Sequence, residues 1–213
     1  MTKSSSVTNK SNKIKSYTKG EEIANALTHG LGSLAAIIVA PILIAQSLGT
    51  PLLCDFSAHV DLSAQTVAAR ASGTATVAAS IYVLSLALEF AFSALYHALT
   101  NERAKRIFKV IDHSGIYILI AGTYTPFAMI VLQGNSGGLL LALVWGLTII
   151  GISAEAFWTF RPKWVSVVIY LLMGWCVVWF MPQMLACFDP HGMTLLIIGG
   201  ICYTIGCVFY VLK

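Results

Sequence analysis

Residues 193–212 read MTLLIIGGICYTIGCVFYVL, twenty residues without one charged side chain. A helix needs about twenty apolar residues to cross the hydrocarbon core of a bilayer. Five more apolar runs meet this requirement, at 23–47, 71–97, 110–132, 138–160 and 164–186. The runs show no alternation of apolar and polar residues with a period of two, which is the pattern of strands in a transmembrane barrel. A segment that crosses lipid alone must satisfy its backbone amides internally, as a helix does. The sequence therefore predicts an all-α polytopic membrane protein with six transmembrane helices.

The composition supports the same class of protein. Of the 213 residues, 57% are hydrophobic and 10% are charged, whereas soluble domains average about 25% charged residues. We expect one membrane domain over residues 21–213, preceded by a disordered tail at 1–20 that is rich in Ser, Thr, Asn and Lys. The five cysteines show no C-x-x-C spacing. We interpret the four in or beside apolar runs as packing residues rather than disulfides or metal ligands.

The distribution of basic residues predicts the orientation of the chain. If the N-terminus is cytoplasmic, all thirteen Lys and Arg residues except Arg70 fall on the cytoplasmic side. Membrane proteins retain such an excess of Lys and Arg in their cytoplasmic loops. We therefore expect both termini of the chain in the cytoplasm.

Polar side chains enter three predicted helices near this cytoplasmic boundary. They are Glu22, Asn25 and His29 in the first helix, Ser93 and His97 in the second, and Asp112 and His113 in the first turn of the third. Spacings of three and four residues place the members from each of the first two helices on one helical face. Neutral imidazole is a good zinc ligand, and a nearby carboxylate can orient a metal-bound water. The pattern favours a shared polar pocket.

Each of these residues also has a structural interpretation. A carboxylate near a helix N-terminus is stabilised by the helix dipole, and His97 could simply form a hydrogen bond between helices. Glu89, about 12 Å from His97 along the helix, either extends the pocket into the bilayer or pairs with another helix. Glu155 is expected to form a surface ion pair with Arg161 or Lys163. Convergence at one membrane depth favours the functional interpretation, because buried charges are costly.

The sequence resembles the bacterial hemolysin III family, from about residue 19 to the last residue. The segments that carry the resemblance are Glu21-Glu22-Ile23-Ala24-Asn25-Ala26-Leu27-Thr28-His29-Gly30, Ser93-Ala94-Leu95-Tyr96-His97, Asp112-His113 and Gly122-Thr123-Tyr124-Thr125-Pro126-Phe127. That family is related to the progestin and adiponectin receptors and, more distantly, to alkaline ceramidases. The resemblance implies a multi-pass seven-helix bundle in the bacterial plasma (inner) membrane.

The resemblance also implies a zinc ion near the inner face of the membrane. His97 would hold the zinc together with two histidines of an HxxxH motif in a seventh helix. Ser93 and Asp112 would lie beside the metal, with Asp112 acting through the bound water. No two of the five histidines here are four residues apart, and the printed sequence has no seventh apolar run. We therefore expect a truncated form with weak or absent zinc binding and reduced stability.

Three functions are consistent with these features. The first is a zinc-dependent hydrolase of membrane lipid amides or esters, or its inactive remnant, with Asp112 as general base and Ser93 in support. The second is a non-enzymatic protein that forms pores or lyses membranes. The third is a receptor-like protein of membrane homeostasis. We expect membrane lipids as partners, with no nucleic acid and no identifiable protein partner.

Overall fold

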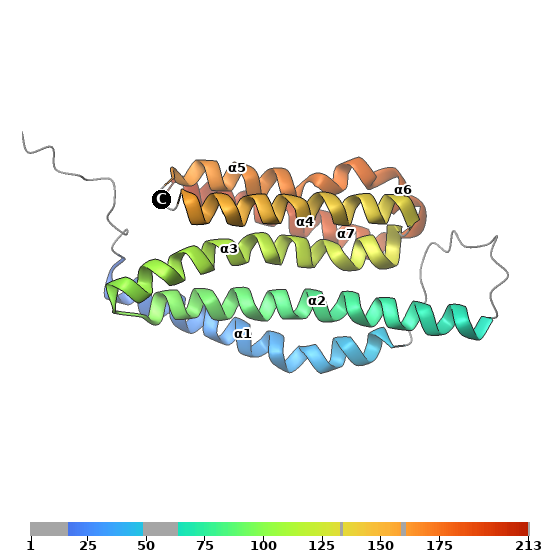
Figure 1. Cartoon of the computed structure of the whole chain (residues 1–213), viewed down its shortest axis with the longest axis horizontal. Coiled ribbons are helices and arrows are strands. Elements are labelled where there is room, and N and C mark those ends of the chain that lie inside the picture. The colour runs from blue at the N-terminus through green and yellow to red at the C-terminus, as the bar shows by residue number, and fades with distance from the viewer. Residues whose placement is uncertain (1–16, 49–63, 133, 159–160, 213) are drawn as a thin grey trace, which may run out of the picture.

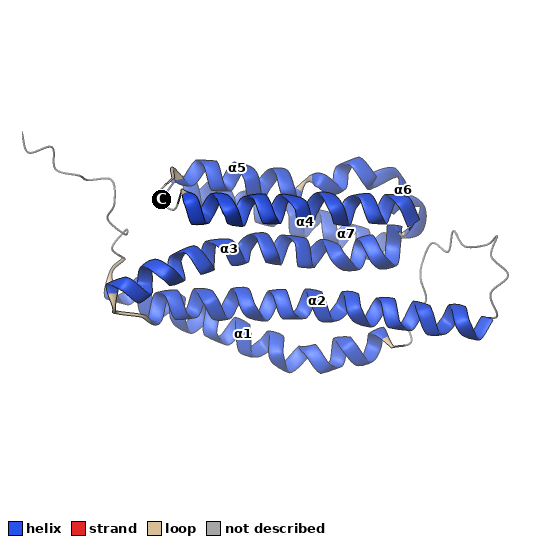
Figure 2. Cartoon of the chain, in the orientation of Figure 1, coloured by secondary structure: helices blue, strands red, loops and turns tan. Residues whose placement is uncertain are grey.

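The computed structural model describes residues 17–48, 64–132, 134–158 and 161–212, and within these ranges it is helical without strands (Figure 2). The side chains of 64–72 and 163 lie outside this description. The elements in chain order are α1 (Lys19–Ser47), α2 (Ala64–Ala98), α3 (Glu102–Pro126), η2 (Phe127–Leu132), α4 (Gly134–Phe157), α5 (Lys163–Gly174), η3 (Cys176–Phe180), α6 (Met181–Cys187) and α7 (Pro190–Leu212).

Six helical segments in the described ranges are long and apolar enough to cross a membrane, as the sequence predicts. They are α1, the part of α2 from residue 73, α3 with η2, α4, α5 with η3 and α6, and α7. Successive segments run in opposite directions (Figure 1). One end of the bundle therefore contains the start of α1, the end of α2 and the start of α3, and we call it the α2–α3 end.

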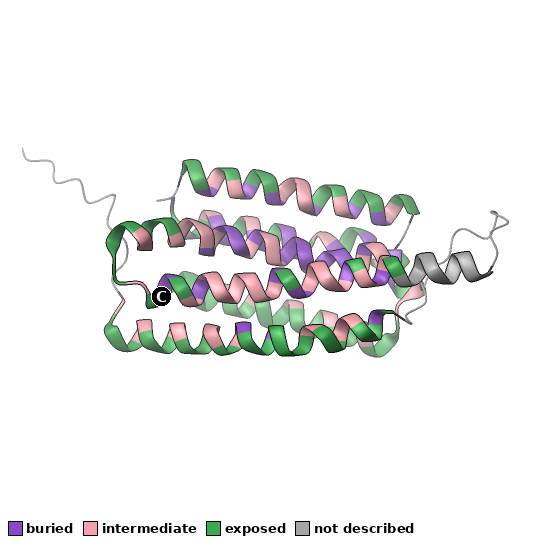
Figure 3. Cartoon of the chain, turned by 60° about the horizontal axis from the view of Figure 1, so that its bottom comes forward, coloured by how far each residue is buried: buried purple, intermediate pink, exposed green. Residues whose placement is uncertain are grey.

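The buried core lies between α3, α4 and the α5–α6 segment. Its fully buried side chains include Tyr117, Leu140, Val144, Met173 and Met184. Figure 3 shows exposed residues along the outer faces of the bundle, and many of them are large and apolar. An apolar exterior is stable in lipid and unstable in water. The burial pattern thus agrees with a membrane-spanning bundle.

Two helix starts differ from the boundaries expected from the sequence. The side chain of Thr18 accepts a hydrogen bond from the backbone N–H of Glu21, so α1 begins at Lys19, inside the predicted tail.

The start of α3 also differs. The side chain of Asn101 accepts hydrogen bonds from the N–H groups of Arg103 and Ala104, and α3 begins at Glu102 rather than at residue 110. Both helix starts have such an N-cap, which satisfies the free amides of a first helical turn. As a result, Asp112 lies well inside α3, and its predicted place in the first turn was wrong.

The fifth span is interrupted at Gly174, where α5 ends before η3 begins. The hydroxyl of Tyr124 donates a hydrogen bond to the carbonyl of Gly174 at 2.5 Å. The same hydroxyl accepts one from the N–H of Val177 at 3.1 Å. Backbone groups freed by a helix break inside a membrane need such partners. A side chain from α3 therefore supports the irregular turn in the neighbouring span.

Cys187, at the end of α6, is disulfide-bonded. The free cysteines in the described ranges are Cys176, Cys202 and Cys207. The prediction that the cysteines in or beside apolar runs form no disulfide was wrong for Cys187. Cys187 lies at the end of the bundle opposite to the α2–α3 end (Figure 1).

Candidate functional site

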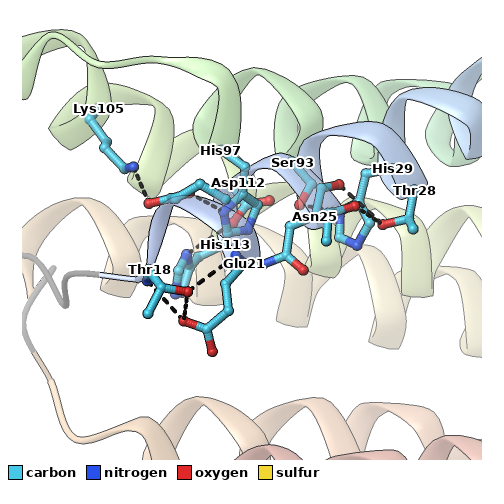
Figure 4. A network of polar contacts seen from close by, with 12 residues as sticks. Thr18, Glu21, Asn25, Thr28, His29, Ser93, His97, Lys105, Asp112 and His113 are labelled. Carbon is cyan, nitrogen blue, oxygen red and sulfur yellow. Dashed lines mark hydrogen bonds and ion pairs between the residues drawn. The ribbon is translucent and has the colours of Figure 1, made fainter.

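The polar face of α1 packs against α2 at the α2–α3 end. The Thr18 cap starts α1 at this end, and Glu22, Asn25 and His29 follow over the next two to three turns. All three side chains are half-buried. Figure 4 shows Asn25 and His29 among side chains from α2 and α3. The helical spacing places these three residues on one face of α1, and two of them, Glu22 and His29, contact side chains of α2.

Ser93 contacts polar groups from both neighbouring helices. Its hydroxyl Oγ lies 2.5 Å from Nδ1 of His29 on α1, and its side chain forms a hydrogen bond with Asp112 on α3. Ser93 and Asp112 are 5% and 9% exposed, respectively. One hydroxyl hydrogen can be donated to one acceptor at a time. Ser93 can thus donate its hydrogen bond to either the imidazole or the carboxylate.

His97 lies in a second set of contacts at the same end. Its Nδ1 lies 2.6 Å from Oε2 of Glu22, and the other oxygen of this carboxylate forms an ion pair with Lys105 of α3. The rings of Tyr17 and Tyr96 pack on the imidazole with centroids at 5.4 and 4.8 Å. When Nδ1–H donates to Glu22, the lone pair of His97 lies on Nε2. The free lone pair gives His97 a site for a proton or another ligand.

The two sets of contacts adjoin each other, because the ring centroids of His29 and His97 are 6.1 Å apart. They form one group of side chains that we call the polar cluster: Glu22, His29, Ser93, His97, Lys105 and Asp112 (Figure 4). Carboxylate, imidazole, hydroxyl and ammonium groups meet there. Such a combination can bind a polar group and move protons to or from it.

His113 lies at the margin of the polar cluster. Its Nδ1 lies 2.8 Å from the carbonyl of Lys109 in its own helix, and 3.6 Å from Oδ2 of Asp112. Its backbone carbonyl accepts a hydrogen bond from the hydroxyl of Tyr170. The backbone of His113 therefore helps to join α3 to α5, whereas its ring packs back along α3.

A separate polar network joins α3, α4 and the start of α5. Oε2 of Glu155 lies 2.5 Å from the guanidinium of Arg161, and the two side chains are 3% and 2% exposed. Arg161 also donates hydrogen bonds to Tyr117 and Ser166. The predicted pair of Glu155 and Arg161 is present, but its predicted surface position was wrong. The residues from 161 onward return toward the core, where Tyr117 and Ser166 complete the hydrogen bonding of the guanidinium.

Glu89 lies on α2, one helical turn from Ser93. Its carboxyl group faces Gly115 of α3, and Oε2 is buried without a hydrogen-bond partner among the described residues. Of the two alternatives that the sequence leaves open, the contacts favour an extension of the pocket. Glu89 has no ion pair in the described parts of the chain.

The described residues do not by themselves fit the zinc ion that the resemblance implies. Among residues 17–48, 64–132, 134–158 and 161–212, no three His, Cys, Asp or Glu side chains are arranged to hold a metal. Nδ1 of His97 contacts Glu22, and that carboxylate is also paired with Lys105. A catalytic zinc site usually has three protein ligands. The expectation of weak or absent zinc binding therefore stays a prediction.

Sequence reasoning missed Lys105, Tyr17 and Tyr96 as neighbours of the polar cluster. Lys105 was interpreted only as a basic residue that sets the orientation. It is 83 residues from Glu22 in the chain, and Tyr17 precedes the first helix. Tyr96 lies in the quoted Ser93–His97 segment, so its proximity to His97 was available from the sequence. The other two contacts depend on how α1 and α3 pack.

The chain is similar to a family of known proteins over almost all of its length. The family model described as "Haemolysin-III related" matches residues 17–213. "Hemolysin-3" of Bacillus cereus is 36% identical over 204 residues, which cover 96% of this chain and 84% of the relative. "Hemolysin-3 homolog" of Bacillus subtilis (strain 168) is 38% identical over 197 residues, 92% of this chain and 83% of the relative. No solved structure matches the chain significantly.

Proposed function

This chain belongs to the haemolysin III family of membrane proteins, and we propose that its polar cluster hydrolyses acyl amide or ester bonds of membrane lipids. The observation that carries the proposal is the double contact of the buried Ser93 hydroxyl with His29 and Asp112. A hydroxyl between two groups that can accept a proton is a common feature of sites that cleave acyl bonds.

The chemistry requires a base, a proton donor for the leaving group, and hydrogen bonds that hold the carbonyl. Asp112 acts as the general base that takes a proton from the attacking water. Ser93 forms hydrogen bonds that orient the reacting groups. His29, in its protonated form, gives a proton to the departing amine or alcohol as the acyl bond breaks, and the proton held by Asp112 then passes through the Ser93 hydroxyl to His29, which restores the site. Glu22 holds His97 so that its Nε2 faces the reaction. General acid–base catalysis of this kind contributes about 10²–10⁴-fold to a rate.

The surroundings of the polar cluster favour a lipid as the substrate. Leu27 and Leu31 of α1, beside His29 in the chain, are 62% and 66% exposed. In a bilayer such side chains face acyl chains, so a lipid would reach the cluster laterally from the membrane. The positive-inside rule assigns this end of the bundle to the cytoplasmic leaflet of the bacterial plasma membrane. The proposed substrate is therefore a lipid of the inner leaflet.

The proposed mechanism does not include zinc, and an experiment decides whether hydrolysis requires it. The resemblance implies a metal held by His97, whereas the described residues lack a complete ligand set. No step above requires a metal. A requirement for zinc would appear as loss of hydrolysis on treatment with a chelator and its return on addition of zinc.

Membrane lysis is the second candidate function, and the names of the two relatives support it. A pore or lytic protein would release the contents of vesicles without cleaving lipid. A receptor-like role in membrane homeostasis, the third alternative from the sequence, would produce neither effect.

The test uses the purified chain in vesicles that contain a labelled fatty amide, a labelled fatty ester and an encapsulated dye. We expect release of labelled fatty acid, and a decrease of about 100-fold or more in Ser93→Ala, Asp112→Asn and His97→Ala. Ser153→Ala is the matched control, because the Ser153 hydroxyl is exposed on α4 and bonds only to the Ile149 carbonyl of its own helix. Dye release that persists in all variants, with no fatty acid formed, would replace the hydrolase proposal with lysis.

A further inference from the structure

Glu89 is a carboxyl group inside a membrane span, outside the polar cluster. It precedes Ser93 by four residues on α2, so the two side chains lie on the same helical face with a rise of about 6 Å between them. Ionisable groups at such positions are costly and usually functional. The position of Glu89 one helical turn from Ser93 therefore calls for an explanation.

The neighbouring helix makes room for this carboxyl group. At Gly115 of α3, an added Cβ atom would collide with Oε2 of Glu89 and also approach the ring of Phe92 at 3.4 Å. The glycine thus permits the carboxyl group to lie between α2 and α3. A structural carboxylate in this position would be expected to pair with a cation or several donors.

The described part of the chain supplies no such partner. Oε2 of Glu89 is buried without a hydrogen bond. The titratable side chains that interact with it electrostatically are Asp112 on α3 and Tyr203 on α7, and neither of them is a cation. An unsatisfied buried acceptor is costly, and a ligand that brings a hydrogen-bond donor removes this cost.

We propose that Glu89 recognises the substrate by accepting a hydrogen bond from a donor next to the scissile carbonyl. This inference rests on the proposed lipid hydrolysis and specifies its substrate class: lipids with an N–H at the acyl bond, which are secondary amides. With the carbonyl at Ser93, the amide bond of about 1.3 Å and a hydrogen bond of about 3 Å together span about 4 Å, which is comparable with the helical rise of about 6 Å between the two residues. An ester or an N-methylated amide leaves Glu89 without its partner.

The experiment measures binding and hydrolysis separately. N-butyl oleamide, N-butyl-N-methyl oleamide and butyl oleate share the same acyl chain, and only the first has an N–H. Versions with a diazirine in the acyl chain are photo-crosslinked to the purified full chain in nanodiscs, and the yield is measured by mass spectrometry. Hydrolysis of the unmodified compounds is followed in parallel. We expect the secondary amide to be preferred over the tertiary amide by about tenfold or more in crosslinking.

Three variants test the role of Glu89. Glu89→Met removes the acceptor at similar volume, and we expect it to lose the preference for the secondary amide. Glu89→Gln keeps a carbonyl oxygen of the same reach, so it should retain most of the preference. Gly115→Ala crowds the carboxyl group and should weaken the preference. Thermal unfolding of each variant checks that the fold is intact.

The outcomes separate this inference from the proposed function. Equal crosslinking of secondary and tertiary amides by the unmodified chain, or an undiminished preference in a folded Glu89→Met, overturns the role of Glu89 even if lipids are hydrolysed. A preference that depends on Glu89 without hydrolysis of any compound supports the recognition site and overturns the hydrolase. Absence of both overturns both.

Discussion

The Glu22 carboxylate joins His97 and Lys105, which belong to two different helices. Through this single side chain, the start of α1 is connected to the end of α2 and the start of α3. The loop between α2 and α3 is short, so the three helix ends are held together at one end of the bundle. This contact also determines which nitrogen of His97 is free.

Replacing Glu22 should destabilise the protein. In Glu22→Ala, the largely buried His97 and Lys105 lose their shared acceptor, and we expect a decrease of about 1–3 kcal/mol in the free energy of unfolding. Chemical denaturation in detergent micelles measures this value. Glu102→Ala is the control, because Glu102 is exposed and its loss should cost less than about 0.5 kcal/mol. Equal effects of the two substitutions would contradict the structural role of Glu22.

The buried pair of Glu155 and Arg161 should behave as a unit. Arg161→Met leaves a buried carboxylate without its partner, and we expect a loss of about 3–5 kcal/mol. The double variant Glu155→Leu with Arg161→Met removes both charges and should be more stable than Arg161→Met alone. Thermal unfolding of the single and double variants forms the test. If the double variant were the less stable one, the pair would not be coupled in this way.

Close packing of α2 against α3 depends on Gly122. An added Cβ atom there would collide with the side chain of Ser85, and we expect Gly122→Ala to cost about 1–3 kcal/mol. At Gly138 of α4 an added Cβ atom meets nothing within 4 Å. Gly138→Ala should be neutral or stabilising by up to about 1 kcal/mol. A similar loss at both positions, measured by thermal unfolding, would contradict the predicted difference in packing.

The positive-inside rule predicts which end of the bundle faces the cytoplasm. Thr100 lies at the α2–α3 end and Asn135 at the opposite end, and both are exposed. In intact cells, a membrane-impermeant thiol reagent should modify Asn135→Cys. It should modify Thr100→Cys only after the membrane is permeabilised. The unsubstituted chain, with its own cysteines, provides the background. The reverse pattern would place the polar cluster on the outer side.

The sequence predicted more of the fold than of the candidate site. Each span consists of about twenty neighbouring apolar residues, so the six spans and the helical class were predicted correctly. The family was also predicted correctly, from the quoted motifs. Errors occurred where a short cap decides a boundary, as at Asn101. A second error concerned Glu155 and Arg161, because proximity in the chain indicated their pairing but could not indicate their burial.

The transmembrane architecture was decided mostly locally, because lipid favours segments that satisfy their backbone hydrogen bonds within their own helix, and the break at Gly174 is the exception that needs Tyr124. The polar groups of α1, α2 and α3 could also be assigned to one end of the bundle from the order of the spans. Their actual partners could not be assigned this way. Which oxygen meets His97, which base meets Ser93, and the absence of a described partner for Oε2 of Glu89 depend on the rotation and packing of whole helices. Those are set by contacts between residues far apart in the chain, which no local pattern of residues records.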